Sequence, residues 1–366
     1  MTRTEAYLVL NLLPKIGPVR VRRLLEVFGS PERILAAKAH EILRIEGFGR
    51  ELAETISGWE ASIDLSRELR RIGEMELTIL TQEDALYPPL LREIHSPPLV
   101  LYVWGELIEK DRNAIGVVGS RQASLYGLDA AKKMSFQMGY AGFTVVSGLA
   151  RGIDTAAHEG ALASKGRTIA VIGAGMGQLY PPENMGLAER IAKQGAVITE
   201  FPVDYPPDRQ SFPLRNRIVA GWCSGLLVVE APVRSGSLIT ANQATEMGRA
   251  VYAVPGNIDR PTSAGCNKLI QQGAKLVMDG GDILDDLMVL FPTVPRAPKL
   301  EAPTLPSNLS ADEEAVFAAL GTEQSHIDQI TARCGLSSAS VSSTLMRLEM
   351  KRLVRPLPGL RYVKLV

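Results

Sequence analysis

The chain has 366 residues, of which 46% are hydrophobic and 22% are charged, and its 40 Lys and Arg balance its 40 Asp and Glu. This composition indicates a folded protein of two or three domains, and the zero net charge excludes a generally basic surface, so any nucleic-acid site must be a local patch. The three cysteines form no Cys-x-x-Cys pair, which argues against a zinc knuckle or a disulfide framework. Without a leader pattern or about 18 successive apolar residues, we expect a cytoplasmic protein that crosses no membrane.

The first sixty residues predict short helices joined by glycine turns. Two of these turns, 16–19 and 47–49, resemble helix-hairpin-helix turns, in which backbone N–H groups at a helix start bind a DNA phosphate. Simple helix packing is the favoured alternative, because Glu46 and Glu51 place negative charge beside the second turn. We assign residues 1–80 to an amino-terminal helical domain.

From residue 114 to about residue 290, apolar runs alternate with helical patterns, which is typical of a parallel sheet with crossover helices. The predicted strands are 99–104, 114–119, 143–147, 168–173, 196–200, 226–230 and 251–254. We therefore predict an α/β fold over residues 81–291, a Rossmann-like parallel sheet with helices on both faces. Ligands of such sheets bind beyond the carboxyl ends of the strands, near the point where strand order reverses.

The predicted strand 114–119 leads into Gly119-Ser120-Arg121, a candidate phosphate-binding turn. Glycine would let backbone N–H groups approach an anion, the serine hydroxyl would hydrogen-bond it, and the guanidinium would add a fixed positive charge. Arg151, in the turn at 147–154 after the next strand, suits the same role. An ordinary strand-to-helix turn with a solvated arginine is the alternative for the first of these turns.

Two neighbouring features carry weaker signals. Residues 173–178 resemble a dinucleotide fingerprint, but the third glycine comes one place early, and residues 180–182 (Tyr-Pro-Pro) interrupt the helix that should receive the pyrophosphate. We therefore interpret this segment as a tight turn and loop rather than an NAD site. His158 lies alone on an Ala-rich helix, and we expect it to be a packed, hydrogen-bonded residue rather than a catalytic one.

Residues 208–217 concentrate cations around an aromatic ring just before a predicted helix. The candidate contacts are Arg209, Phe212, Arg215, Asn216 and Arg217. Arginines interleaved with an aromatic residue are typical of single-stranded nucleic-acid binding, in which guanidinium groups hold phosphates and a ring stacks on a base of any identity. In the alternative, the ring anchors the loop on the core and some of the arginines form internal ion pairs with Asp204, Asp208 or Glu230.

The last 75 residues contain two segments of different character. Residues 292–309 hold five prolines in eighteen positions and predict a stiff, extended linker. Residues 310–366 show helical patterns followed by two short strands around Pro358-Gly359, the plan of a winged helix. The helix expected to read bases, 338–352, begins with serines and carries its basic residues late, so a DNA reader and a protein-contact module both remain open.

Five ordered motifs of the central region resemble those of the DNA processing protein A family, DprA, also called Smf. They are Gly-Ser-Arg at 119–121, Ser-Gly-Leu-Ala-Arg-Gly-Ile-Asp at 147–154, Phe-Pro-Leu-Arg-Asn-Arg at 212–217, Ser-Gly-Ser-Leu-Ile-Thr at 235–240 and Val-Pro-Gly-Asn at 254–257. The resemblance implies a homodimer, formed through the Rossmann-like domain, that binds and protects incoming single-stranded DNA and loads RecA on it during natural transformation. It also implies that Gly119, Ser120 and Arg121 form one DNA pocket. Arg209 and Phe212 fall where the family places a basic residue, usually lysine, and a base-stacking aromatic.

An enzyme is the competing class, because the same Rossmann variant resembles the nucleotide phosphoribohydrolases described as lysine decarboxylase-like. Their Pro-Gly-Gly-x-Gly-Thr-x-x-Glu loop corresponds here to 234–240, and the next acid, Glu246, lies too far along the helix to match. With no paired carboxylates, no nucleophile beside a base and no metal-ligand set, we expect a binding protein without catalytic residues, metal or cofactor. A transcription regulator that uses the winged helix is a third reading.

Overall fold

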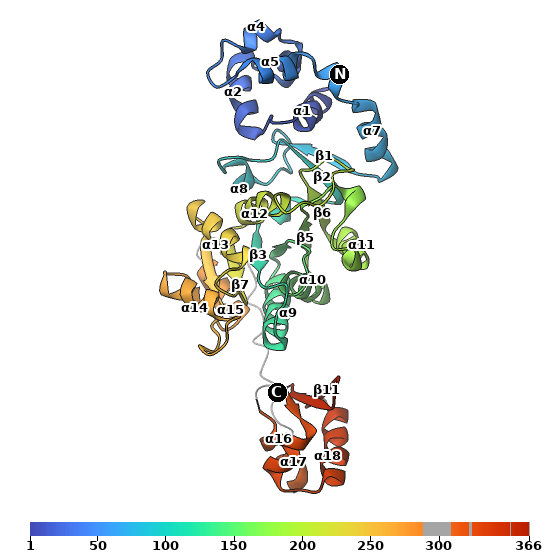
Figure 1. The fold of residues 1–366 in the computed structure, drawn as a ribbon, viewed down its shortest axis with the longest axis vertical. Coiled ribbons are helices and arrows are strands. Elements are labelled where there is room, and N and C mark those ends of the chain that lie inside the picture. Colours follow the sequence, from blue (N-terminus) through green and yellow to red (C-terminus); the bar gives the residue numbers. More distant parts are fainter. Residues whose placement is uncertain (288–308, 322–323, 352, 366) are drawn as a thin grey trace. The chain divides into compact units, whose positions relative to one another are not determined.

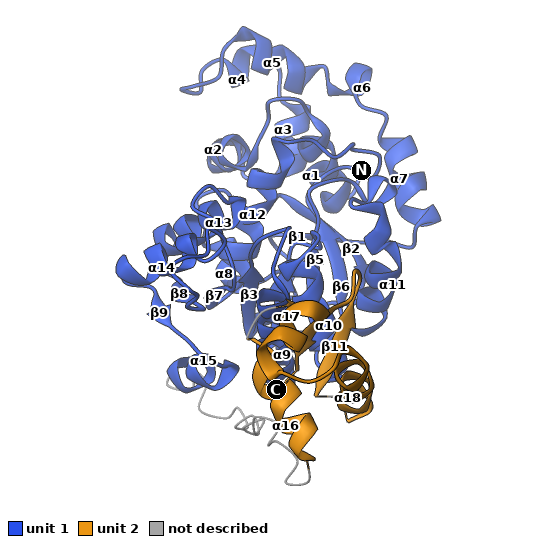
Figure 2. Ribbon diagram, turned by 60° about the horizontal axis from the view of Figure 1, so that its bottom comes forward, with its two compact units in different colours: residues 1–297 blue, residues 298–366 orange. Residues whose placement is uncertain are grey.

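The computed structural model describes residues 1–287, 309–321, 324–351 and 353–365. The chain divides into two compact units, unit 1 (residues 1–297) and unit 2 (residues 298–366), which Figure 2 colours separately. The predicted linker, 292–309, lies outside the described residues except for its last position. Separate domains at 1–80 and 81–291 stay a prediction, and the boundary between them falls inside strand β1 (Thr78–Thr81). In the described parts of the chain, no helix has the length and apolarity needed to span a membrane.

Unit 1 begins with a cluster of short helices (Figure 1). They are α1 (Arg3–Leu12), α2 (Pro18–Phe28), α3 (Pro31–Ala36), α4 (Ala39–Ile42), α5 (Arg50–Ser57), α6 (Trp59–Ser62) and α7 (Leu65–Glu74). The two glycine turns precede α2 and α5, and Pro18 begins α2, where its missing N–H leaves no hydrogen bond unmade. The predicted series of short helices is confirmed.

Nine strands among the described residues form one sheet, in the order β1-β2-β6-β5-β4-β3-β7-β8-β9. After β1 they are β2 (Val100–Gly105), β3 (Ala114–Val118), β4 (Thr144–Ser147), β5 (Thr168–Val171), β6 (Ala196–Thr199), β7 (Gly225–Val228), β8 (Ala250–Ala253) and β9 (Lys275–Leu276). The strands from β6 to β9 run parallel, and β2 and β1 extend the sheet antiparallel at one edge. All seven predicted strands are present, whereas the short strands β1 and β9 were not predicted.

Helices cover both faces of this sheet (Figure 1). One face carries α9 (Leu125–Tyr140), α10 (Ile153–Ala163), α11 (Met185–Gln194) and α15 (Gly280–Leu287); the other carries α8 (Pro89–Arg92), α12 (Ser211–Trp222), α13 (Gly236–Glu246) and α14 (Ala264–Gln271). Successive side chains of a strand alternate between the faces, so Ile115 and Val117 join one core while Ala114 and Val118 join the other. The predicted Rossmann-like α/β fold is confirmed.

Strand β3 lies where the strand order reverses. The chain runs from β3 through β4 and β5 to β6, and then returns by way of α12 to β7 on the other side of β3. In a parallel sheet, ligands bind at the carboxyl ends of the strands beside such a reversal. This topology brings the turns after β3, β4 and β5 to the same edge as the start of α12.

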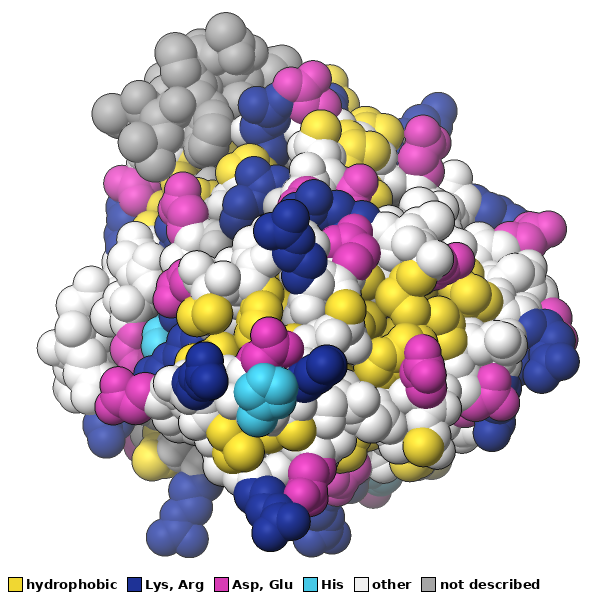
Figure 3. Space-filling model, turned by 90° about the horizontal axis from the view of Figure 1, so that it is seen from above, with side chains coloured by type: hydrophobic (Ala, Val, Ile, Leu, Met, Phe, Trp, Pro, Cys, Tyr) yellow, Lys and Arg dark blue, Asp and Glu magenta, His cyan; other side chains and the backbone are white. Residues whose placement is uncertain are grey.

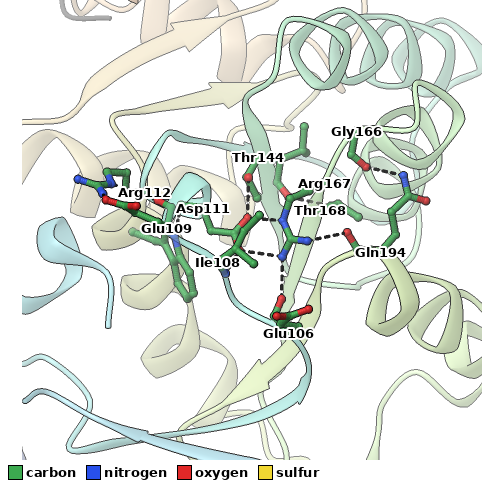
Figure 4. A network of polar contacts seen from close by, with 12 residues as sticks. Glu106, Ile108, Glu109, Asp111, Arg112, Thr144, Gly166, Arg167, Thr168 and Gln194 are labelled. Carbon is green, nitrogen blue, oxygen red and sulfur yellow. Dashed lines mark hydrogen bonds and ion pairs between the residues drawn. The ribbon is translucent and has the colours of Figure 1, made fainter. Parts of the chain in front are cut away.

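A partly buried ion pair ties together the opposite, amino-terminal edge of the sheet (Figure 4). Arg167 binds Asp111 through two contacts, Nε to Oδ1 at 2.7 Å and Nη2 to Oδ2 at 2.8 Å. The Thr144 hydroxyl and the Ile108 N–H donate to the same carboxylate at 2.8 and 2.9 Å. Further Arg167 donors reach two backbone carbonyls. This network joins the short 3-10 helix η1 (Glu109–Arg112) to the starts of β4 and β5.

Unit 2 is a winged helix. It contains α16 (Ala311–Ala319), β10 (Ser325–His326), α17 (Ile327–Cys334), α18 (Ser338–Met350), β11 (Val354–Leu357) and β12 (Arg361–Lys364), and its strands form a sheet in the order β10-β12-β11. Val316, Ile330 and Leu345 meet in a separate core. The three predicted helical patterns and the hairpin around residues 358–359 are confirmed.

Candidate nucleic-acid interface

A pocket lies at the carboxyl edge of the large sheet, where the turns after β3, β4 and β5 meet the first turn of α12. Its lining residues are Arg121, Gly148, Ala150, Arg151, Tyr180, Pro181, Phe212 and Arg215. Four residues that the sequence predicted for DNA contact, Arg121, Arg151, Phe212 and Arg215, are thus brought together from three separate segments. Gly119, Ser120, Arg209, Asn216 and Arg217 are not among the lining residues.

The aromatic part of the cluster is packed against a cation. Arg121 is exposed, and its Cζ lies over the ring of Phe212, 5.1 Å from the ring centroid. Helix α12 begins at Ser211, so Phe212 and the residues after it lie within the helix, and the prediction that they precede it is wrong. Pro213 does not break the helix because the N–H groups of a first turn have no intrahelical partner in any case.

Arg215 lies beneath the exposed side chains, only 4% exposed, and donates from Nη1 to the Val171 carbonyl. Burial lowers the pKa of Arg215 to about 10, and the nearby carboxylate of Asp154 partly offsets this effect. The guanidinium occupies the space beside Gly148, where any Cβ would collide with it. Glycine at this position therefore makes room for a buried positive charge next to the pocket.

Asp154 holds the turn that carries Gly148. Its carboxylate accepts the N–H of Gly148 at 3.1 Å and that of Ala150 at 3.3 Å. Burial raises the pKa of Asp154, while Arg215 and these two N–H donors lower it. The turn after β4 is therefore shaped by one of the chain's own carboxylates.

A second carboxylate, that of Glu230, occupies the start of α9. It is 3% exposed and accepts both the N–H and the hydroxyl of Ser124, at 3.0 and 2.9 Å, while the Glu230 carbonyl accepts the Ser120 N–H at 2.6 Å. The Ser120 N–H is therefore already bound by an internal carbonyl, whereas the contact of this turn with an anion stays a prediction. Gly119 is required for close packing: a Cβ there would lie 2.5 Å from Cγ1 of Ile153.

The other predicted contacts differ in their surroundings. Arg151 pairs with Glu183 and remains largely exposed. Arg209 is exposed and Asn216 is half-buried. Arg217 donates to the Ser96 carbonyl at 2.6 Å and pairs with Glu200, so the internal ion pair foreseen as an alternative is present with a different acid.

His158 has the predicted structural role. It is fully buried, and its Nδ1 lies 2.7 Å from the hydroxyl of Thr168. Burial lowers the pKa of His158 to about 3, so the ring is neutral near pH 7. Across the described ranges, no three His, Cys, Asp or Glu side chains are placed to hold a metal ion. Glu246 is exposed at the end of α13.

Tyr180 is the lining residue with an exposed ring that sequence reasoning missed. Its side chain is 39% exposed, and its ring centroid lies 6.1 Å from that of Phe212. In the sequence, Tyr-Pro-Pro at 180–182 predicts a break in the helix but gives no ligand contact. The two prolines also predict a loop after β5, at the carboxyl edge of the sheet. That signal could have placed the ring of Tyr180 beside the other candidate residues.

Charge is mixed on the face of the molecule that Figure 3 shows. On the face in Figure 3, which looks onto the end where α1 to α5 lie in Figure 1, Lys and Arg side chains are interspersed with Asp and Glu. The amino-terminal helices pair several of these charges, for example Lys15 with Glu51 and Arg50 with Glu54. This face therefore presents no continuous basic surface of the kind that binds a nucleic-acid backbone.

Comparisons with known proteins agree with this architecture. The family model described as DNA recombination-mediator protein A matches residues 78–288, and models of a DprA winged helix domain and of a SAM-like helix-hairpin-helix tandem match residues 300–359 and 8–57. Protein Smf of Synechocystis is 35% identical over 378 residues, covering 95% of each chain.

Two solved structures have a similar fold. The X-ray structure of DNA processing protein A from Streptococcus pneumoniae aligns with a TM-score of 0.68 at 36% identity, covering 78% of this chain and 98% of that one. The protein of the same name from Helicobacter pylori, whose structure concerns its single-stranded DNA binding mode, aligns with a TM-score of 0.53 at 24% identity, covering 59% and 98%.

Proposed function

Because the chain belongs to the DNA recombination-mediator protein A family, whose members include proteins named DprA and Smf, we propose that it binds single-stranded DNA at the Arg121–Phe212 pocket. The observation that carries this proposal is the convergence of Arg121, Arg151 and the ring of Phe212 on one pocket at the carboxyl edge. Exposed guanidinium groups hold phosphates and aromatic rings stack on bases of any identity. Binding is therefore independent of sequence and weakens steeply with salt.

The groups of the site support binding rather than catalysis. The start of α9, the position that accepts a phosphate in nucleotide-binding Rossmann folds, is occupied here by the carboxylate of Glu230. The N–H groups of Gly148 and Ala150, in the turn after β4, are bound by the carboxylate of Asp154. His158, the histidine of this region, is buried and neutral. The charged side chains that line the pocket, those of Arg121, Arg151 and Arg215, are all cations, which suit a polyanion.

The proposal extends to the family's role in recombination. We infer that the protein acts as a homodimer through its Rossmann-like domain, protects incoming single-stranded DNA and loads RecA on it during natural transformation. The matching family description, recombination mediator, supports this extension. A strand bound mainly through its phosphates keeps its bases accessible to a recombinase.

Fluorescence anisotropy of a labelled oligothymidylate of about 20 nucleotides, titrated in salt from about 50 to 200 mM, tests the DNA site. Arg121→Glu and Arg209→Glu each place a negative charge beside the proposed path. Arg190→Glu, an exposed reversal on α11, is the matched control. We expect the Arg121→Glu and Arg209→Glu variants to lose most of their affinity, the control to bind like the wild type, and circular dichroism to show all of them folded.

Equal binding by the wild type and by the Arg121→Glu and Arg209→Glu variants would place the DNA elsewhere, and absence of wild-type binding would reject the function. The recombination role needs its own assay, RecA-catalysed strand exchange on DNA coated with single-strand-binding protein. Stimulation by the wild type but not by Arg121→Glu is the expected result. No stimulation would leave a DNA-binding protein without mediator activity.

A further inference from the structure

We propose that Tyr180 is a second base-stacking residue of this pocket, on which one nucleobase of the bound strand lies. The inference rests on the proposed function, because it concerns the same site. Tyr180 belongs to the loop after β5, whereas Phe212 belongs to α12, so the two rings reach the pocket from different segments. Their 6.1 Å centroid distance and 53° tilt show that they contact without stacking on each other.

The surroundings of Phe212 are the first argument. The ring is half-buried and packs against Gly173, where a Cβ would lie 3.0 Å from its Cδ1. The guanidinium of Arg121 lies over the ring as well. A base that stacked on this covered face would first have to displace a cation. Tyr180, in contrast, is 39% exposed beside the same cation.

The rigidity of the Tyr180 loop is the second argument. The neighbours on either side, Leu179 and Pro181, are both buried. Asn184 donates to the Leu149 carbonyl at 2.8 Å and to the Thr155 hydroxyl at 3.0 Å. The loop is thereby fastened to the turn after β4, and a ring held in this way loses little conformational entropy when a base stacks on it.

The position of charge around Tyr180 is the third argument. Arg151 lines the same pocket and pairs with Glu183, three residues after the tyrosine. A strand whose base lies on Tyr180 therefore has Arg121 and Arg151 beside it for its phosphates. Exchange of the Glu183 carboxylate for a phosphate keeps the arginine paired.

Three substitutions separate stacking from space filling. Tyr180→Phe keeps the aromatic face, Tyr180→Leu keeps apolar volume without it, and Tyr180→Ala removes both. Tyr140→Ala is the matched control, because Tyr140 is 53% exposed and also contacts a phenylalanine ring, Phe136, but lies at the far end of α9. We expect Ala and Leu to weaken oligothymidylate binding by about 5- to 100-fold and Phe and the control to change it by less than about twofold.

The salt dependence of binding and the fluorescence of a labelled base distinguish stacking on Tyr180 from a purely structural role of this residue. The salt slope of Tyr180→Ala should equal that of the wild type, because no phosphate contact is removed, whereas Arg121→Ala should lower it by about 0.7. A 2-aminopurine base placed along the oligonucleotide should be quenched at one position by the wild type and not by Tyr180→Leu.

The outcomes distinguish this inference from the proposed function. Wild-type binding that is lost in Arg121→Glu but unchanged in Tyr180→Ala would overturn the stacking role alone. Equal weakening by Leu and Phe, or full rescue by Leu, would also overturn it. Absence of DNA binding by the wild type would reject the proposed function itself.

Discussion

The two edges of the large sheet each contain an arginine near a buried aspartate, but the two arginines differ in their hydrogen bonds. At the amino-terminal edge, Arg167 and Asp111 meet in a bidentate pair whose carboxylate also accepts a hydroxyl and a backbone N–H. At the carboxyl edge, Arg215 makes a carbonyl hydrogen bond through Nη1, and its Nε has no hydrogen-bond partner among the described residues. The bidentate pair stabilises the fold, whereas the incompletely hydrogen-bonded Arg215 keeps positive charge beneath the pocket.

The difference follows from what each edge must do. A buried ion pair offsets its desolvation only when every lone pair and N–H finds a partner. At the amino-terminal edge, the Asp111 carboxylate accepts four hydrogen bonds and the Arg167 guanidinium donates four. The carboxyl edge leaves Arg121 and Arg151 exposed. Stability and binding should therefore respond to substitutions at different edges.

The largest effect on stability is expected for Asp111→Ala. Removal of this carboxylate, 3% exposed, leaves Arg167 without its counter-charge and should lower the free energy of unfolding by about 3 to 5 kcal/mol. Urea unfolding followed by tryptophan fluorescence measures this change, because all three tryptophans lie in unit 1. Glu109→Ala, which breaks the exposed pair with Arg112, should cost less than about 0.5 kcal/mol. A loss below about 1 kcal/mol for Asp111→Ala would contradict the contrast.

Arg215→Met should affect both the stability of the fold and DNA binding. It leaves Asp154 buried without a counter-charge, and we expect about 2 to 4 kcal/mol of destabilisation at pH 7 and weaker DNA binding. Burial raises the folded-state pKa of Asp154 above 3.8, and loss of Arg215 raises it further. The folded state then binds the proton more tightly than the unfolded state, so the deficit should shrink as pH falls toward 3.8. Urea titrations across this range measure it, and a pH-independent deficit would exclude Asp154 as the cause.

The buried histidine predicts a smaller, pH-dependent effect next to the pocket. The pKa of His158 falls from 6.5 to about 3 on folding, so the unfolded state takes up a proton first and stability decreases as pH falls below 6.5. Between pH 7 and pH 5 this group should remove about 2 kcal/mol from the free energy of unfolding. His158→Gln should flatten that part of the profile. Parallel profiles for wild type and His158→Gln would show that another group titrates.

The smallest stability effect should accompany a large loss of binding. Arg121→Ala removes a cation–π contact at an exposed site, which contributes about 0.5 to 1 kcal/mol. Its affinity for oligothymidylate should fall at least about tenfold. Anisotropy tests the predicted loss of affinity, and urea unfolding of the same preparation tests the predicted small change in stability. If Arg121→Ala destabilised the protein as much as Asp111→Ala, Arg121 would be a residue that stabilises the fold.

Much of the architecture was predictable because it depends on local pattern. Alternation of apolar runs with helical segments predicted the parallel sheet. Because the carboxyl ends of parallel strands lie at one edge, the predicted strand ends also showed which turns meet there. Strand β9 was not predicted because its two exposed residues carry no pattern, and β1 was missed because threonines at both ends leave only two apolar residues and no continuous buried run. The start of α12 was misplaced because Pro213 suggests a break, yet is tolerated in a first turn.

The sequence by itself determined the α/β class, the winged helix and the presence of Arg121, Arg151 and Phe212 at strand ends and a helix start. Only the tertiary structure decided which cations remain available, because ion pairs and carbonyl hydrogen bonds form between residues far apart in the chain. Arg217 is bound by Glu200 and Ser96, whereas Arg121 is left exposed over a ring. The packing also placed Tyr180 in the pocket, since the contact between this loop and α12 depends on distances that no sequence pattern encodes.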